Sequence, residues 1–345
     1  MSAAAQYAYL HGRVSIFGTR LLQPDQLDKL IQLPPEQEDE LYQTAGFARP
    51  VGEDPEQLRS SLEQRLIALL LADVVILARP LIGRARDFLV YWAYRFELSN
   101  LKVILRGKLS GQNAAVIRAQ LVDLGSYGRL PTEELLRTDD VAELLRRLDG
   151  TPYADVARQA RRVYEERHEL FALDAAIDRQ YFAGLAKRAH EAGGDASGAL
   201  RGLVGNMIDR LNLLWLLRYR FAYGLAPSEA YYLLIPATHR LDGRTLLALS
   251  QLNSFDEVIT RLPPPWAEQL AGAATTVEVM HRLERESWRL AEAVLHRSVF
   301  NLARVFAYLV LRERDLRQMR AIIRGRRIGL PTEAIREAVG HVPAH

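Results

Sequence analysis

Apolar and polar positions along this chain follow the spacing of helices, not of strands. Ala, Leu, Arg, Glu and Gln dominate, and these residues favour helices. Valine and isoleucine never gather into alternating runs, so the strand signal is almost absent. The pattern therefore predicts an all-α protein. Proline and glycine clusters end the helices, and the long ones are expected at about 60–78, 83–108, 154–192, 199–221, 277–297 and 299–326.

Three of these long helices carry the same polar pattern, [DE]-x₂-[NQ]-[LM]-x₂-[IL]-[IL]-R-x-[KR]. The copies start at residues 97, 209 and 315, which are 112 and 106 residues apart. The repeated polar positions are Glu97, Asn100 and Arg106, then Asp209, Asn212 and Arg218, then Asp315, Gln318 and Arg324. A glycine follows each arginine by five or six positions (Gly111, Gly224, Gly329). Regular self-similarity of this kind is typical of a repeat architecture.

A fainter repeat lies upstream of each copy. Its leucines recur as Leu22 and Leu27, Leu130 and Leu135, and Leu241 and Leu246. We interpret each repeat as a short module followed by a long motif helix, about 110 residues in all. The sequence therefore predicts three similar helical lobes, 1–128, 129–238 and 239–345. Three like lobes favour a pseudo-three-fold arrangement, forming a funnel-shaped collar.

The geometry of a helix decides which motif positions share a face. At 100° per residue the acid falls on the side of the [LM] and [IL] positions, and the arginine lies opposite. A carboxylate on a packed face needs a donor, because an unpaired buried charge is costly. The amide one turn away is one possible donor, and an arginine from a neighbouring helix is another. We interpret the acid as a buried clamp, since catalysis needs several groups in one pocket rather than one group in each of three places.

Composition narrows the classes of function. The chain has no cysteine, which excludes disulfides and thiolate metal sites, and its formal net charge of +3 is small for 345 residues. The N-terminus lacks the features of a signal peptide. The most apolar stretch, 66–78, is interrupted by Asp73 and is shorter than the roughly 20 residues of a membrane span. We expect a buried helix there.

Motifs for cofactors and catalysis are missing from the sequence. It contains no G-x-x-x-x-G-K-[ST] loop to hold phosphates, no G-x-G-x-x-G, no H-E-x-x-H and no nucleophile elbow. The eight histidines are scattered, and the closest pair, His341 and His345, flanks Pro343. No catalytic residue, cofactor or metal is expected. Two basic stretches, 312–327 and 218–223, keep open the hypothesis of a nucleic-acid-binding helical repeat.

Four stretches of the chain carry a resemblance to a known family: Tyr7–Val14, Glu97–Lys102, Ile177–Phe182, and Leu309–Arg324 with Ile328–Pro331. In this order they resemble one subunit of V-type and archaeal A-type ATPases, which is called C in bacteria and archaea and d in eukaryotes. The middle motif departs from the others, because Leu214 and Trp215 make its helix more apolar.

The resemblance implies a funnel of three helical lobes in the central stalk, a rotor subunit that does no chemistry. Its partners would be the D and F subunits of the shaft and the membrane rotor ring of proteolipid c/K subunits, without nucleic acid or direct bilayer insertion. It would lie at the cytoplasmic face of the membrane and couple ATP hydrolysis or synthesis to ion transport.

An arginine cluster at the end of the third motif helix is the candidate contact with the shaft. It consists of Arg320, Arg324, Arg326 and Arg327. The alternative is a solvated helix end, where the helix dipole favours cations. The competing hypothesis for the whole chain is a helical-repeat scaffold or nucleic-acid-binding protein unrelated to ATPases.

Overall fold

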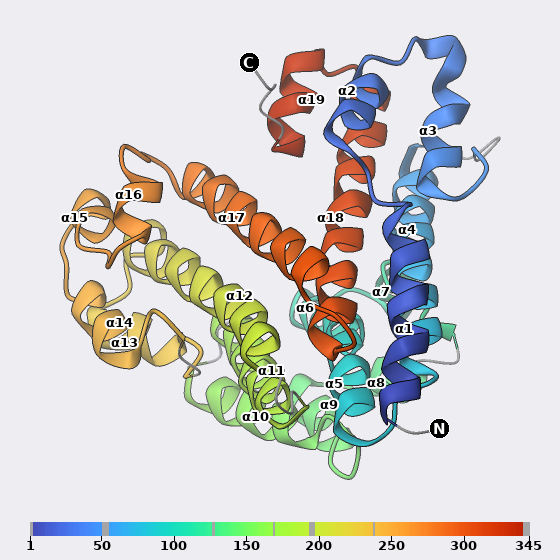
Figure 1. Cartoon of the computed structure of the whole chain (residues 1–345). Coiled ribbons are helices and arrows are strands. Elements are labelled where there is room, and N and C mark those ends of the chain that lie inside the picture. Colours follow the sequence, from blue (N-terminus) through green and yellow to red (C-terminus); the bar gives the residue numbers. More distant parts are fainter. Residues whose placement is uncertain are drawn as a thin grey trace. The chain divides into compact units, whose positions relative to one another are not determined.

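The computed structural model describes residues 3–49, 55–125, 128–167, 170–192, 197–236 and 239–340 (Figure 1). Its regular elements are helices, and none of these residues forms a strand, so the predicted all-α class is confirmed. The elements are α1 (Ala3–Gly18), α2 (Pro24–Gln32), the 3₁₀ helix η1 (Pro35–Gln37), α3 (Glu38–Ala45), α4 (Pro55–Ala78), α5 (Gly83–Ala93), α6 (Arg95–Leu109), α7 (Ala114–Ala119), α8 (Thr132–Arg137), α9 (Val141–Arg147), α10 (Ala154–Arg167), α11 (Leu170–Ala192), α12 (Ser197–Leu217), the π helix η4 (Arg218–Ala222), α13 (Pro227–Leu233), α14 (Gly243–Ser250), α15 (Phe255–Thr260), α16 (Trp266–Leu270), α17 (Thr276–Arg297), α18 (Leu302–Arg327) and α19 (Thr332–Val339).

Three of the predicted helices differ from the observed ones. The expected helix at 154–192 is wrong as a single element, because the structure has two helices there, α10 (Ala154–Arg167) and α11 (Leu170–Ala192), which pack against each other. The expected helix at 83–108 is wrong as a single element, because the chain turns at Tyr94, whose N–H donates to the Tyr91 carbonyl (3.1 Å). The last long helix begins at Leu302 rather than 299. Phe300 adopts a φ of 52°, which helix geometry excludes, and the Asn301 side chain caps the first turn of α18.

The described chain forms two compact units, Met1–Val90 with Trp288–His345, and Tyr91–Ser287. These limits differ from the predicted lobe boundaries at 128/129 and 238/239, and the three lobes with their pseudo-three-fold arrangement stay a prediction. In the first unit α18 packs along α4 and α1. Aromatic pairs support the packing of α18: Phe17 of α1 lies against Tyr308, and Phe88 of α5 meets Phe306 edge to face.

In the second unit the long helices α10, α11 and α12 pack in sequence. One buried cluster continues from α12 into the short helices α13 to α16 and ends on the first half of α17. Tyr181 of α11 stacks on Tyr91, and its hydroxyl donates to the Trp92 carbonyl (2.9 Å). These contacts tie α11 to the turn between α5 and α6.

Each motif helix ends in the same way, at the glycine that recurs in the sequence. Gly111, Gly224 and Gly329 have φ values of 66°, 67° and 70°, the left-handed region that side chains disfavour. The next N–H returns to the helix: Gln112 to Gly107 (2.8 Å), Leu225 to Tyr219 (2.9 Å) and Leu330 to Gly325 (2.8 Å). In the middle copy this hydrogen bond spans one residue more than in the other two, because its motif helix ends in the π helix η4.

Candidate functional site

The repeated acid of each motif helix is buried and bonded to a module. Glu97 is 2% exposed, and Asp209 and Asp315 are 0% exposed. Each carboxylate accepts a backbone N–H two or three residues before a module helix begins. The pairs are Arg129 N–H to Glu97 before α8, Arg240 N–H to Asp209 before α14, and Leu22 N–H to Asp315 before α2, each at 2.8 Å. The acid thereby fixes the start of the module.

The repeated amide has a partner of its own. Asn100 pairs with both backbone groups of Val122 (2.7 and 2.9 Å), and Asn212 pairs in the same way with Ile235 (3.1 and 2.8 Å). Gln318 makes one such bond, to the Val339 carbonyl (3.3 Å). The amide therefore does not supply the donor of the acid, which was one of the two donors expected from the sequence. It holds the segment that follows the motif helix.

The basic residue that ends each motif holds the other end of the module helix. Lys108 donates to the carbonyls of Leu136 (2.7 Å) and Thr138 at the end of α8. Arg220 donates to Ser250 (2.8 Å) and Leu252 (3.1 Å) at the end of α14, and Arg326 to Ile31 (3.3 Å) at the end of α2. Carbonyls at a helix C-terminus lack helical partners, so these cations satisfy them.

Each motif helix thus grips one module helix at both ends, and we call this arrangement a clamp. The first clamp joins α6 to α8, the second joins α12 to α14, and the third joins α18 to α2. The first two motif helices therefore bind the module that follows them in the sequence, not the module that precedes them within the predicted repeat. For the third motif helix the module is the first one in the chain.

Burial raises the pKa of all three acids, and the pKa of Glu97 rises to about 6. One oxygen of Glu97 and one of Asp209 are buried without a hydrogen-bond partner in the described part of the chain. Asp315 differs, because its second oxygen accepts from the Arg314 guanidinium (3.0 Å). The first two carboxylates therefore have an oxygen that can take up a proton.

Glu97→Gln is expected to flatten the dependence of unfolding free energy on pH. In the unfolded chain the Glu97 carboxyl has its usual pKa near 4.5, so the folded protein binds a proton at this residue more readily than the unfolded chain does. This residue therefore adds stability as the pH falls from above 6 toward 4.5, by about 2 kcal/mol in total. Urea unfolding of both proteins between pH 4.5 and 7.5 measures the difference.

The control for this experiment is Glu133→Gln on the surface. A hydrogen bond from Arg118 holds the pKa of Glu133 below its usual range, so its contribution has the opposite sign. Parallel stability curves for the wild type and Glu97→Gln would show that the acid keeps an ordinary pKa in the folded protein.

The repeated arginine is exposed in every copy, as its helical position requires. Arg106 bonds to Asp174 of α11, and Arg218 lies over the Tyr223 ring (5.4 Å to the centroid). For Arg324, no hydrogen bond, ion pair or ring contact engages the guanidinium among the described residues. Its two equivalents are therefore satisfied within the chain while it is not.

Within the candidate shaft cluster, Arg320 and Arg326 have hydrogen-bond partners inside the chain. Arg320 binds both oxygens of Glu63 on α4 (2.7 and 2.8 Å), and Arg326 belongs to the third clamp. The Arg327 guanidinium lies near the Tyr42 hydroxyl, where it opposes the burial that raises the pKa of this group. The four arginines of the cluster thus lie together at the end of α18, but they differ in their contacts within the chain.

Pairs of charged residues also connect neighbouring long helices, and sequence reasoning missed them. Lys102 binds Asp178 (2.5 Å) and Arg106 binds Asp174, so two bases four residues apart on α6 face two acids four residues apart on α11. The equal spacing of the two bases and the two acids could have predicted these ion pairs from the sequence. In the middle motif Leu214 replaces Lys102, and Leu214 and Trp215 pack partly buried against the core.

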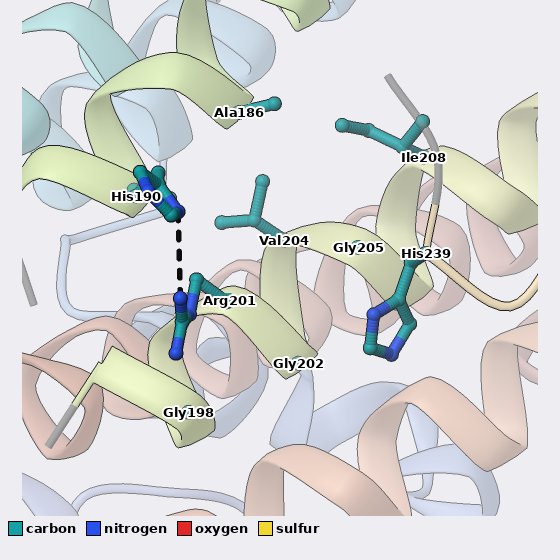
Figure 2. A pocket seen from close by; sticks show the side chains of 10 residues that line it. Ala186, His190, Gly198, Arg201, Gly202, Val204, Gly205, Ile208 and His239 are labelled. Atoms are coloured by element: carbon teal, nitrogen blue, oxygen red, sulfur yellow. Dashed lines mark hydrogen bonds between the residues drawn. The ribbon is translucent and has the colours of Figure 1, made fainter.

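A pocket of about 390 Å³ lies on α11 and α12 (Figure 2). Its walls are mainly small or apolar, with Gly198, Gly202 and Gly205 on α12. His190 contacts Arg201 (3.4 Å), and the His239 ring lies against Gly205, where a Cβ atom would meet it at 2.4 Å. These groups do not form a set of ligands for a cofactor.

Metal ligands and membrane spans are both missing from the part of the chain that the structure describes. No three His, Asp or Glu side chains gather there to hold a metal ion, and His341 and His345 lie outside the described residues. None of the helices described is long and apolar enough to cross a bilayer.

The profile of a family described as ATP synthase (C/AC39) subunit matches residues 10–338. The chain belongs to this family. It is similar to the C subunit of the A-type ATP synthase of Methanocaldococcus jannaschii, with 25% identity over 343 residues, 96% of this chain and 86% of the relative. The same protein of Haloquadratum walsbyi is 25% identical over 349 residues (95% and 96%), and that of Halobacterium salinarum 28% over 267 residues (73% and 74%). The resemblance to the C subunit of A/V-type ATPases is confirmed.

The stretches that carry the resemblance make structural contacts in this member of the family. Ile177–Phe182 lies in α11, where Asp178 pairs with Lys102, Arg179 donates to the Leu234 carbonyl (2.9 Å) and Tyr181 binds the turn before α6. These contacts show that Ile177–Phe182 joins α11 to neighbouring elements in this chain.

Proposed function

We propose that this chain is a non-catalytic rotor subunit of an A/V-type ATPase, a socket between the rotating shaft and the membrane-embedded ring. Membership of the ATP synthase (C/AC39) subunit family over residues 10–338 carries this proposal. The protein would couple ATP hydrolysis or synthesis to ion transport. It would sit peripherally at the cytoplasmic face of the membrane, with the D and F subunits of the shaft and the proteolipid c/K ring as partners.

The clamps support a mechanical role. A protein that transmits torque must keep its helices in place under load, and each clamp fixes a module helix at both ends with bonds from one long helix. Buried hydrogen bonds to charged groups contribute about 1.5–3 kcal/mol each. The repeated acid and the basic residue that ends each motif are thereby engaged in holding the fold together.

The end of α18 is the surface we propose for the shaft. Arg320 and Arg326 are engaged inside the chain, so the contact narrows to Arg324 and Arg327, both exposed. Ile328, 73% exposed, follows them directly. The equivalent Arg106 forms an ion pair with the Asp174 carboxylate, so we expect Arg324 to bind a carboxylate of the partner protein.

Reversing both charges, Arg324→Glu with Arg327→Glu, is expected to weaken capture of a D–F complex at least about tenfold at low salt. Charge complementarity steers association, and salt screens it, so the loss should shrink as salt rises. The measurement is binding of the folded variant to immobilised D–F at two ionic strengths. The melting temperature reports whether folding is intact.

The matched control is Arg146→Glu with Arg244→Glu, two exposed arginines on α9 and α14. It should bind D–F like the wild type. Wild-type capture by the α18 variant would remove this surface from the shaft contact. Failure of the wild-type chain to bind D–F at all, together with tight binding of single-stranded DNA, would favour the helical-repeat nucleic-acid binder instead.

A further inference from the structure

The third clamp is closed by the beginning of the chain. Glu97 and Asp209 bind N–H groups 32 and 31 residues downstream, whereas Asp315 binds the Leu22 N–H, 293 residues away in sequence. All of these bonds lie within single compact units. The module at residues 21–33 is therefore held by the third motif helix across the ends of the chain.

The basic end of this clamp makes the weakest bond of the three. The amide outside the clamp is also weaker, because Gln318 makes one bond of 3.3 Å to Val339 of α19, whereas Asn100 and Asn212 each make two of 3.1 Å or less. Lys108 binds two module carbonyls and Arg220 binds two, but Arg326 binds one at 3.3 Å. At the acid position the third clamp equals the other two, because each acid accepts a backbone N–H at 2.8 Å.

A further charge contact ties α2 to the rest of the unit. Arg336 of α19 lies 3.7 Å from Asp28, and it also binds Glu333 on its own helix. Such a partly exposed pair contributes little. The buried side chains Leu22, Leu27, Leu30 and Ile31 hold the module by apolar contact, and Asp315 holds it by hydrogen bonding.

We infer that residues 21–33 form a latch, pinned by Asp315, that opens from α18 before the rest of its unit unfolds. Local opening selects the element with the weakest ties to its surroundings, and the third clamp meets that description among the three. Opening breaks the bond from Arg326 to Ile31 and frees Arg326 beside the exposed Arg324. The inference stands on the clamps and does not depend on the proposed shaft contact.

Native-state hydrogen exchange of three equivalent amides tests the latch. The N–H groups of Leu22, Arg129 and Arg240 bind the three repeated acids at the same distance of 2.8 Å. The Leu22 amide is expected to exchange at least about tenfold faster than the other two, once intrinsic rates are divided out. Equal protection of the three amides would overturn the inference.

A lysine-specific protease gives a second readout, because the chain has four lysines: Lys29, Lys102, Lys108 and Lys187. Lys29 lies in the latch, and cutting there requires α2 to open. Arg326→Gln removes the bond at the end of α2 and should speed cleavage at Lys29 several-fold without changing cleavage at Lys187. The matched variant Arg220→Gln, in the second clamp, should leave cleavage at Lys29 unchanged.

The outcomes separate a latch from general instability. Faster cutting at Lys29 alone supports the latch. Lys187 lies in the other compact unit, so equal acceleration at Lys29 and Lys187 by Arg326→Gln would mean that the chain is destabilised throughout and not at the latch. No acceleration at Lys29 would mean that Arg326 does not hold the module. Either result overturns the inference.

Discussion

Replacing Asp315 by alanine is expected to lower the free energy of unfolding by about 3–5 kcal/mol, the cost of breaking a buried ion pair by removing one partner. Asp315 is 0% exposed and binds two groups, the Leu22 N–H (2.8 Å) and the Arg314 guanidinium (3.0 Å). The Arg314 side chain is only 11% exposed, and it would keep only Glu292, the more exposed of its two carboxylate partners. Urea unfolding at pH 7 measures the loss.

The comparison variant is Asp209→Ala at the equivalent position. Its acid is just as buried, but the hydrogen bond that it accepts comes from a backbone N–H, that of Arg240. Leaving that donor unsatisfied is expected to cost about 1–3 kcal/mol, less than the loss at Asp315. Equal losses at the two positions would show that Arg314 adds nothing to the third clamp.

Asp73→Ala is expected to cost a similar amount, about 3–5 kcal/mol, because it removes the carboxylate that pairs with a buried arginine. Asp73 interrupts the apolar face of α4 and accepts from the Tyr308 hydroxyl (2.6 Å). Arg312, 9% exposed, lies 3.6 Å from the same carboxylate. The loss of both contacts should appear as a lower melting temperature and an earlier urea midpoint.

Tyr308→Phe isolates one part of this network. It removes the hydroxyl but keeps the ring, which packs against Phe17, and it leaves Asp73 beside Arg312. We expect a loss of about 1–2 kcal/mol. A loss as large as that of Asp73→Ala would assign the energy to the hydroxyl bond instead of the charge pair.

Helical geometry predicted the faces of the motif correctly, because 100° per residue leaves no freedom once a helix is assumed. Glu97, Asp209 and Asp315 are buried, and Arg106, Arg218 and Arg324 are exposed. The interpretation of the acid as a buried clamp rests on the same reasoning. The positive φ of the repeated glycines also agrees with their places in the sequence.

The partners of these residues could not be predicted in the same way. A carboxylate on a packed face requires a donor, but the donor came from the backbone of a module rather than from an amide or another helix. The module that each motif helix binds depends on the path of the chain after that helix. The order of the repeat in the sequence predicted the preceding module, whereas the first two motif helices bind the following one. Arg326 illustrates the point, since its contact with Ile31 joins residues 295 positions apart.

The π helix at Arg218–Ala222 shows how this fold accommodates a change of chain length. The middle copy has one residue more than the others between its last motif position and its glycine, yet Asp209 and Arg220 keep the same spacing as Glu97 and Lys108. The extra residue widens a single turn instead of rotating everything after it. Deleting Ala222 should turn that part of the helix back into an ordinary α-helical end. One residue can therefore be gained or lost at this position while the hydrogen bonds of Asp209 and Arg220 stay in place.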